Sequence, residues 1–208
     1  LGLDPFEIRI RNVPDKGEAF IPGDTPCDGE WRTALETAKR AIGFDTPRPA
    51  NVDRARGVSL GLKSSSTASA SFALVRLHFD GSVTVLSATS DMGQGARTVL
   101  AQVAAEELGT AVDRVAIVMG DTAIVPYDSS TSASRSSVFM GHAVANACRD
   151  IKAQLRTMAA ETFELPEAEI AIEPGRVKLR DRDGSDGVIS YADLLKQHFG
   201  STRGEVIG

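Results

Sequence analysis

Two loops built from glycine and hydroxyl-bearing residues, each followed by a helical pattern, constrain this chain more than any other feature. The first is Asp91-Met92-Gly93-Gln94-Gly95, and the second includes Ser129-Ser130-Thr131-Ser132-Ala133-Ser134-Arg135-Ser136. A loop that brings backbone N–H groups against an anion needs small side chains, and the helix start behind it adds partial positive charge. Both loops are therefore predicted to hold an anionic ligand. Neither carries a general base, which indicates a cofactor-holding part of an enzyme rather than a complete catalytic unit.

The composition is that of a globular chain with a sizeable core. It has 208 residues, 42% of them hydrophobic, enough for one domain or two small ones. The net charge of -5 comes from interspersed acidic and basic residues, which argues against nucleic acid or an anionic membrane as the main partner. No apolar run approaches the length of a membrane span. Cys27 and Cys148 lie far apart in unlike contexts, so we expect no disulfide framework and a reducing, cytoplasmic location.

The order of helical and alternating patterns predicts an α+β fold. We expect a helix from a cap at Asp28 to Ile42, a strand over residues 57–62, and two strands joined by a two-residue turn at Asp80-Gly81. Further expected elements are a helix through Leu108 that stops at Gly109, a strand at Val115 and Ile117, a helix over about residues 137–163, a hairpin around Pro174-Gly175 and a helix capped by Ser190. In residues 4–10 the helix and strand periods compete, and the type stays open.

These elements imply an antiparallel or mixed sheet with hairpins and two main helices packed on it. We expect a division into an N-terminal helical and connecting segment, residues 1–53, and a ligand-binding α+β domain, residues 54–208. The long helix carries a ridge of small residues, Gly141, Ala145 and Cys148, where another backbone can approach closely.

The first loop has a plain structural interpretation as well as a functional one. A Gly-x-Gly between a strand and a helix often makes only a tight turn, and a dinucleotide site is disfavoured because the third glycine is missing. The preceding strand also comes from an antiparallel hairpin rather than a βαβ unit. Gln94 favours a binding role, because its amide can both donate to and accept from a ligand. Asp91 is interpreted as a cap or turn residue in preference to a general base.

The second loop is either a polar linker or a binding loop, and we favour binding. Arg135 lies among hydroxyls at a helix start, where its guanidinium can engage a phosphate or a carboxylate. Tyr127 and Asp128 fit a substrate entrance or a simple turn equally well. His142 is interpreted as a packed or surface residue, because the histidines lack the spacing of a metal site and no direct metal ligand is predicted.

Taken together, the segments resemble the large, molybdopterin-binding subunit of the xanthine dehydrogenase and aldehyde oxidase family of molybdenum hydroxylases. The resemblance lies in the order of several blocks: Leu1-Gly2-Leu3-Asp4-Pro5 through Arg11-Asn12, residues 57–63, Met92 to Gly95 with Thr98, Gln102 and Leu108-Gly109, then Gly120-Asp121-Thr122, and Thr131 to Ser136 with Gly141 and Ala143-Val144. As a set these blocks are specific, and they span nearly the whole chain.

The resemblance implies a cofactor site and a reaction. Met92, Gly93, Gln94 and Gly95 are implied to approach the molybdopterin and its metal. The residues Ala133, Ser134, Arg135 and Ser136 are implied to hold its pterin and phosphate side through main-chain and hydroxyl contacts. The implied reaction is oxidative hydroxylation of an aldehyde or N-heterocycle.

The resemblance also implies that this chain is a fragment of a larger assembly. It predicts that a general-base glutamate lies outside the chain, and we do not assign that role to Glu205. Iron-sulfur clusters and FAD are implied on other domains or subunits. The implied partners are the rest of the large subunit, the iron-sulfur and flavin parts and a small-molecule substrate, in an oligomer. The cofactor form, including the cytosine dinucleotide, is left open.

Two alternatives remain at this point. The same cofactor serves enzymes of the carbon monoxide dehydrogenase and aromatic acyl-CoA reductase types, and these residues do not separate those reactions. A non-catalytic subunit-interaction domain is the alternative from another class. In it, the loops are flexible and the small-residue ridge packs against a partner.

Overall fold

The computed structural model describes residues 2–47, 53–61, 70–180 and 186–208. The chain forms two compact units, residues 1–63 and 64–208, and each is described by itself.

The first unit contains two helices and a small core. Helix α1 (Pro5–Asn12) begins at Asp4, whose carboxylate accepts from the backbone N–H groups of Phe6 and Glu7 at 2.9 and 3.1 Å. The segment whose type was open is therefore a helix, because Asp4 and Pro5 supply a start signal. Helix α2 is Trp31–Ala41. The buried residues of this core are Phe6, Val13 and Leu35.

Two local predictions in the first unit are wrong. Asp28 does not cap α2, because the helix begins after Glu30 and has no side-chain cap. Residues 57–61 form no strand, and residue 62 lies outside the described residues. Val58 and Leu60 instead pack against the core of Phe6, Val13 and Leu35, so packing against this core replaces pairing in a sheet.

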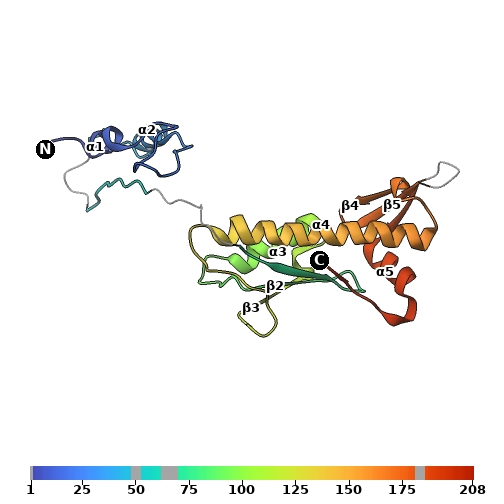
Figure 1. The fold of residues 1–208 in the computed structure, drawn as a ribbon. Helices are drawn as coiled ribbons and strands as arrows, with labels where there is room; N and C mark the ends of the chain where they lie inside the picture. The colour runs from blue at the N-terminus through green and yellow to red at the C-terminus, as the bar shows by residue number, and fades with distance from the viewer. Residues whose placement is uncertain (1, 48–52, 62–69, 181–185) are drawn as a thin grey trace. The chain divides into compact units, whose positions relative to one another are not determined.

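The second unit is built on a four-stranded sheet in the order β3-β2-β1-β7 (Figure 1). Its strands are β1 (Ala73–Leu77), β2 (Val83–Ser87), β3 (Val115–Met119) and β7 (Val206–Ile207). β1 is antiparallel to β2 and β7, whereas β2 and β3 are parallel. Helix α3 (Ala96–Leu108) and the short η1 (Val112–Arg114) connect β2 to β3. The expected antiparallel hairpin leads into β2, and a βαβ crossover that the sequence analysis did not anticipate follows it.

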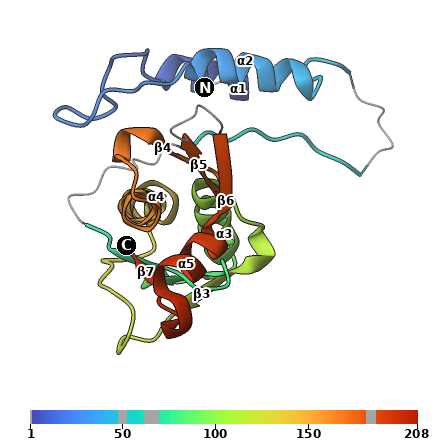
Figure 2. The same cartoon turned by 90° about the vertical axis from the view of Figure 1, so that its right-hand side faces the viewer.

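The long helix α4 (Arg135–Phe163) joins this sheet to a second, three-stranded sheet (Figure 1). The second sheet has the order β4-β5-β6, with β4 (Ile170–Glu173), β5 (Arg176–Arg180) and β6 (Asp186–Ser190). Helix α5 (Tyr191–Phe199) follows it, and the 3-10 turns are η2 (Glu167–Glu169) and η3 (Gly200–Thr202). A view along α4 shows α3 and α4 side by side on one face of the first sheet (Figure 2).

Alternation along the strands explains which face the helices cover. In β1 and β2 the buried residues Val75, Leu77, Val83 and Val85 point to the same face, and they share one core with residues of α3, α4 and α5. Cys148 is fully buried in this core, where burial raises the pKa of its thiol to about 12 and leaves it unreactive at neutral pH.

Most local turn and cap predictions in the second unit are confirmed. Gly109 ends α3 with a φ of 65°, and Ser190 accepts from the N–H of Asp193 at the start of α5. Pro174-Gly175 joins β4 and β5. The hairpin around Gly81 is also present, but its register pairs Leu77 with Val83 and so leaves a longer turn than the expected two residues.

The α+β fold is confirmed, with mixed and antiparallel sheets, hairpins and two main helices. Within the described ranges, no helix combines the length and apolar character needed to cross a membrane.

Candidate functional site

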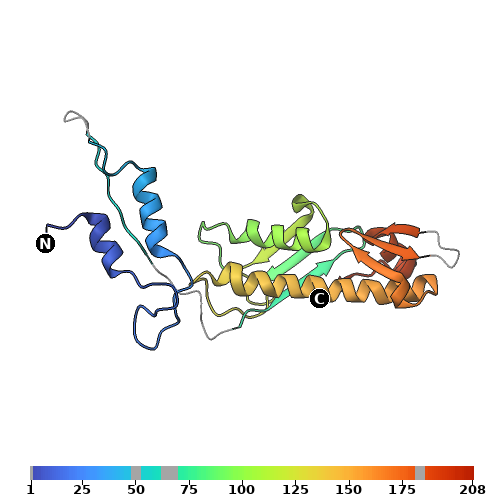
Figure 3. The same ribbon diagram turned by 90° about the horizontal axis from the view of Figure 1, so that it is seen from above.

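Two loops meet at one edge of the first sheet. We call residues 88–95, which follow β2, the first loop, and residues 120–134, which follow β3, the second loop. Because β2 and β3 are parallel neighbours that pair Ser87 with Met119, both loops leave the sheet at the same edge. Helices α3 and α4 begin at this end of the unit and run in the same direction (Figure 3).

The first loop is closed on itself by two side chains. Asp91 accepts from the backbone N–H groups of Gly93 at 3.0 Å and Arg97 at 3.0 Å, so it caps the start of α3. Gln94 accepts from the N–H of Met92 and donates to the carbonyl of Ser90 at 2.8 Å. Both side chains therefore shape the loop backbone.

Asp91 has the electrostatics of a cap and not of a base. The backbone N–H of Arg97 and then that of Gly93 stabilise its charged form, and its pKa lies below the usual value of an aspartate. A carboxylate with a lowered pKa is a weak proton acceptor. The sequence interpretation of Asp91 as a cap or turn residue agrees with this geometry.

The second loop ends in an unusual backbone conformation. Ala133 and Ser134 have positive φ angles of 49° and 60°, and α4 begins at the next residue. Non-glycine residues in the left-handed region cost roughly 1–3 kcal/mol each and persist where the surroundings hold them. The N–H of Arg135 donates to the carbonyl of Ser132 at 2.9 Å and closes this turn. The strain lies at the start of a helix, where N–H groups lack intrahelical acceptors.

Hydrogen bonds join the two loops directly. The N–H of Ser90 donates to the hydroxyl of Thr131 at 3.0 Å, and that hydroxyl donates to the carbonyl of Ser90 at 3.0 Å. A second link runs from the hydroxyl of Thr89 to the carboxylate of Asp128 at 2.8 Å. Hydrogen bonds therefore connect the loop of Gln94 to the loop that leads into Arg135. One connection runs through Ser90 and Thr131, and the other runs from Thr89 through Asp128 to Arg135.

Arg135 and Asp128 form a buried ion pair beneath the loops. Nη2 of Arg135 lies 2.9 Å from Oδ1 of Asp128, and the two side chains are 1% and 2% exposed. Burial raises the pKa of Asp128, but hydrogen bonds from Ser71, Thr89 and Arg135 outweigh it and hold the pKa below its usual value. The guanidinium thus engages a carboxylate of its own chain.

Comparison with known proteins identifies the family. The family model of the molybdopterin cofactor-binding domain matches residues 32–206. The chain belongs to this family. It is 30% identical over 204 residues to a probable xanthine dehydrogenase subunit from Bacillus subtilis (strain 168), in a match that covers 95% of this chain and 27% of that protein.

Two further relatives extend the comparison. The carbon monoxide dehydrogenase large chain of Hydrogenophaga pseudoflava is 37% identical over 125 residues, which covers 60% of this chain and 15% of that protein. The crystal structure of quinoline 2-oxidoreductase from Pseudomonas putida 86 matches with a TM-score of 0.71 and 25% identity, over 100% of this chain and 30% of that one. This molybdopterin cofactor-binding domain therefore spans less than a third of each of these relatives.

The start of α4 fits an anionic group held by the backbone, whereas the N–H groups of Met92, Gly93 and Arg97 at the start of α3 are already donated to Gln94 and Asp91. Two helix starts lie together, and glycines at φ angles of 99° (Gly93) and 82° (Gly95) shape the first of them. Ser136 lies in the first turn of α4, where its N–H and hydroxyl are available for an anion. Met92 is 72% exposed beside this edge. In the described parts of the chain, no group of three or more His, Cys, Asp or Glu side chains is arranged to hold a metal ion.

Sequence reasoning missed three members of the site. Ser71, whose hydroxyl donates to Asp128 at 2.6 Å, and Thr89 were not singled out, and Asp128 was considered only for an entrance or a turn. Tyr127 is 66% exposed beside Phe72, which is 55% exposed. The N–H of Phe72 donates to the carbonyl of Tyr127 at 3.2 Å, so the two residues are neighbours at this edge.

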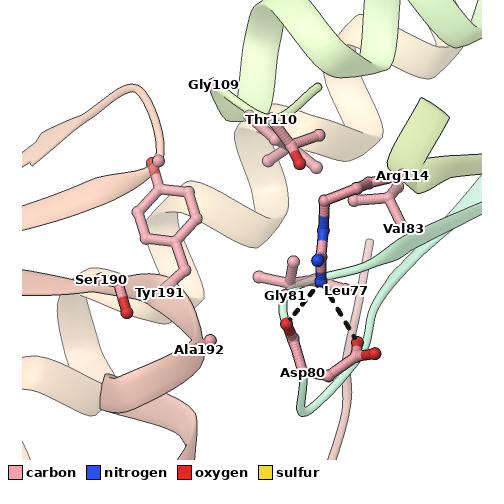
Figure 4. A pocket seen from close by; sticks show the side chains of 12 residues that line it. Leu77, Asp80, Gly81, Val83, Gly109, Thr110, Arg114, Ser190, Tyr191 and Ala192 are labelled. Carbon is pink, nitrogen blue, oxygen red and sulfur yellow. Dashed lines mark hydrogen bonds and ion pairs between the residues drawn. The ribbon is translucent and has the colours of Figure 1, made fainter. Parts of the chain in front are cut away.

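A separate cavity of about 160 Å³ lies at the other end of α3 (Figure 4). Tyr191 and Arg114 lie on opposite sides of it, and Arg114 donates to the carbonyl of Asp80 at 2.7 Å. The hydroxyl of Tyr191 donates to the carbonyl of Glu173 at 2.6 Å. Both polar groups are therefore used within the fold, and none of the residues that line this cavity belongs to the two loops.

Proposed function

We propose that this chain is the cofactor-holding part of a molybdenum hydroxylase of the xanthine dehydrogenase and aldehyde oxidase type. The observation that carries the proposal is the convergence of two hydrogen-bonded loops at adjacent helix starts, in a chain whose residues 32–206 match the molybdopterin cofactor-binding family. The cofactor-holding domain of the proposal is residues 54–208.

In this proposal the second loop holds the anionic side of the molybdopterin, and the first loop lies against the cofactor. Met92, Gly93, Gln94 and Gly95 approach the cofactor from the first loop, and the cofactor's anionic side is bound by Ala133, Ser134, Arg135 and Ser136 at the start of α4. Partial positive charge at the start of α4 favours the anion, whereas the start of α3 is already capped by the carboxylate of Asp91. Arg135 contributes through the backbone turn that it closes, since its N–H donates to the carbonyl of Ser132 and its guanidinium is 1% exposed and paired with Asp128.

The proposed reaction is the oxidative hydroxylation of an aldehyde or an N-heterocycle. The bound molybdenum supplies the redox chemistry, and this chain orients the cofactor. Support comes from relatives named as a xanthine dehydrogenase subunit and a quinoline 2-oxidoreductase. The exposed rings of Tyr127 and Phe72 are proposed to line the substrate entrance, because they lie beside the loops.

The proposal includes the rest of the machinery elsewhere in the assembly. It places the general base outside this chain, the electron acceptors on iron-sulfur and FAD domains or subunits, and the oligomeric enzyme in the cytoplasm. The low coverage of the relatives, 27% of the Bacillus subtilis protein, supports further parts of this kind. The cofactor is proposed to be molybdopterin or its cytosine dinucleotide form.

A second candidate function is carbon monoxide oxidation with the same cofactor. It is favoured by the 37% identity to the carbon monoxide dehydrogenase large chain over 125 residues. Dye reduction by the purified protein with carbon monoxide, with aldehydes and with N-heterocycles separates the two reactions. Turnover of carbon monoxide alone favours the second candidate.

Metal analysis tests the cofactor assignment. The protein is expressed from its own gene together with the neighbouring genes, and the molybdenum per chain is measured with the fluorescence of the released, oxidised pterin. Wild type is expected to contain both. Substitution of Gln94→Ala together with Ser136→Ala is expected to lower both, because it opens the first loop and removes a hydroxyl at the start of α4.

The matched control is Gln197→Ala, an exposed residue of α5 in the same unit. It should leave the molybdenum content unchanged. Absence of molybdenum from the wild type, or unchanged content in the double variant, contradicts the proposed site. The first of these results would favour a non-catalytic interaction domain.

A further inference from the structure

We propose that Asp128 and Arg135 are positioning residues whose buried ion pair sets the two loops at the spacing that the cofactor requires. The inference rests on the proposed function, but it concerns side chains that would not touch the cofactor. In this inference the Arg135 guanidinium does not bind the anion. It holds in place the backbone that binds the anion.

The carboxylate of Asp128 joins three separate segments of the unit. Ser71, just before β1, donates to it at 2.6 Å, and Thr89, at the base of the first loop, donates at 2.8 Å. Arg135, at the start of α4, donates at 2.9 Å. The N–H of Ser129 adds a fourth hydrogen bond at 2.9 Å. One side chain therefore fixes the first loop, the second loop and the start of α4 to the edge of the sheet.

Arg135 braces the second loop from inside. Its Nε donates to the carbonyl of Ser130 at 3.1 Å, and its Nη2 donates to the carbonyl of Ala70 at 3.2 Å and to the hydroxyl of Ser71 at 2.9 Å. The guanidinium also lies 4.8 Å from the ring centroid of Phe139. The left-handed residues Ala133 and Ser134 are thus held between two anchored points.

Burial makes this arrangement sensitive to small changes. A buried charge that loses its partner is strongly destabilising, whereas replacing both partners by apolar groups of similar size is often tolerated. The fold and the loop spacing can therefore be separated by experiment. An apolar pair can preserve the packing, but it has no means to hold Ser71, Thr89 and Ser130 in place.

The central test is the double variant Asp128→Leu with Arg135→Met, in the protein expressed from its own gene with the neighbouring genes. Thermal unfolding and molybdenum per chain are both measured. The single variant Asp128→Leu should lower the unfolding temperature, and the double variant should recover most of that loss. The molybdenum content of the double variant should stay at least about tenfold below that of the wild type, the size of loss typical when groups that support a metal site from outside are removed.

A milder variant keeps the test decisive if the double variant does not fold. Thr89→Val retains the ion pair and the shape of the side chain but removes the hydroxyl that bonds Oδ2 of Asp128. It should lower the molybdenum content while lowering the unfolding temperature less than Asp128→Leu does, because Asp128 keeps its hydrogen bonds from Ser71, Ser129 and Arg135. The matched control is Glu107→Gln, which alters another carboxylate ion pair between α3 and α4, near the far end of α3. That variant should keep its molybdenum.

The possible results distinguish the two proposals. Recovery of molybdenum in step with stability in the double variant, or full molybdenum in a folded Thr89→Val protein, overturns the positioning role and leaves the proposed function standing. A wild type without molybdenum overturns both. Stable variants that lack molybdenum, beside a loaded Glu107→Gln control, support the inference.

Discussion

At the residue scale, Gly109 is a position where both the backbone conformation and a close neighbour exclude a side chain. It ends α3 with a φ of 65°, and a Cβ there would overlap the backbone of Pro174 in the turn of the second sheet. Gly109→Ala should therefore destabilise the protein by about 2–4 kcal/mol, from the left-handed conformation and the overlap together. Thermal unfolding measures this as a drop of roughly 5–15 °C.

Gly141 offers the matched control for this prediction. It lies in α4 without a positive φ, and an added Cβ would have nothing within 4 Å. Gly141→Ala should be neutral or stabilising, by up to about 1 kcal/mol, because alanine loses less entropy in a helix. Equal losses of stability in the two variants would contradict the close approach at Gly109. Among the residues that the structure describes, none makes the close approach to Gly141 that was expected at the small-residue ridge.

Single residues with local signals were predictable, and the buried pair was not. Ser190 and Gly109 act within a few residues of themselves, so their roles follow from the neighbouring sequence. Asp128 depends on Ser71 and Thr89, which are 57 and 39 residues away. Without the strand order, the sequence around Asp128 does not show whether its carboxylate accepts hydrogen bonds from distant segments or only from its own turn.

At the element scale, an ionic cluster joins α3 to α4 away from the loops. The carboxylate of Glu107 accepts from Lys152 at 2.6 Å and from Arg149 at 3.2 Å, and the Lys152 hydrogen bond is the main cause that lowers its pKa. A carboxylate with a lowered pKa in the folded state stabilises the fold above the pKa of its unfolded state. That stability is lost as the pH falls below about 4.3, the pKa of an unperturbed glutamate, and then through the lower pKa that Glu107 has in the folded protein.

The variant Glu107→Gln should remove this contribution. Its side chain is 21% exposed, so we expect a loss of about 0.5–1 kcal/mol at pH 7, in the range of partly exposed ion pairs. The difference from wild type should shrink toward pH 3, where the carboxylate is protonated. Urea unfolding at both pH values measures it. A difference that persists undiminished at pH 3 would assign the effect to packing.

The strand and the strand pairing that the sequence patterns did not predict both depend on segments far away in the chain. β7 is two residues long and pairs with β1, whose Leu77 lies opposite Val206. The parallel pairing of β2 with β3 likewise depends on α3 packing back on the sheet, and no local pattern records it. This pairing is also what brings the two loops to one edge. The loops were identified from their composition, but their meeting follows from strand order.

At the scale of the whole molecule, two separate cores predict two separable responses to mutation. Phe6, Val13 and Leu35 form the core of the first unit, and none of them belongs to the cluster that contains Val85 and Leu100. Phe6 is fully buried against Phe44, with ring centroids 4.7 Å apart. Phe6→Ala should cost about 3–5 kcal/mol, which is most of what so small a core supplies.

Hydrogen exchange measured by mass spectrometry resolves this response along the chain. In Phe6→Ala, amides of α1 and α2 should lose protection while those of β1, β2 and α4 keep it, because no buried residue is shared between the cores. Leu100→Ala is the reciprocal variant, since Leu100 is fully buried in the second core. It should lower protection throughout the second unit and spare α1 and α2. Loss of protection in both units from either substitution would show one cooperative unit, because local opening of one core would then require opening of the other.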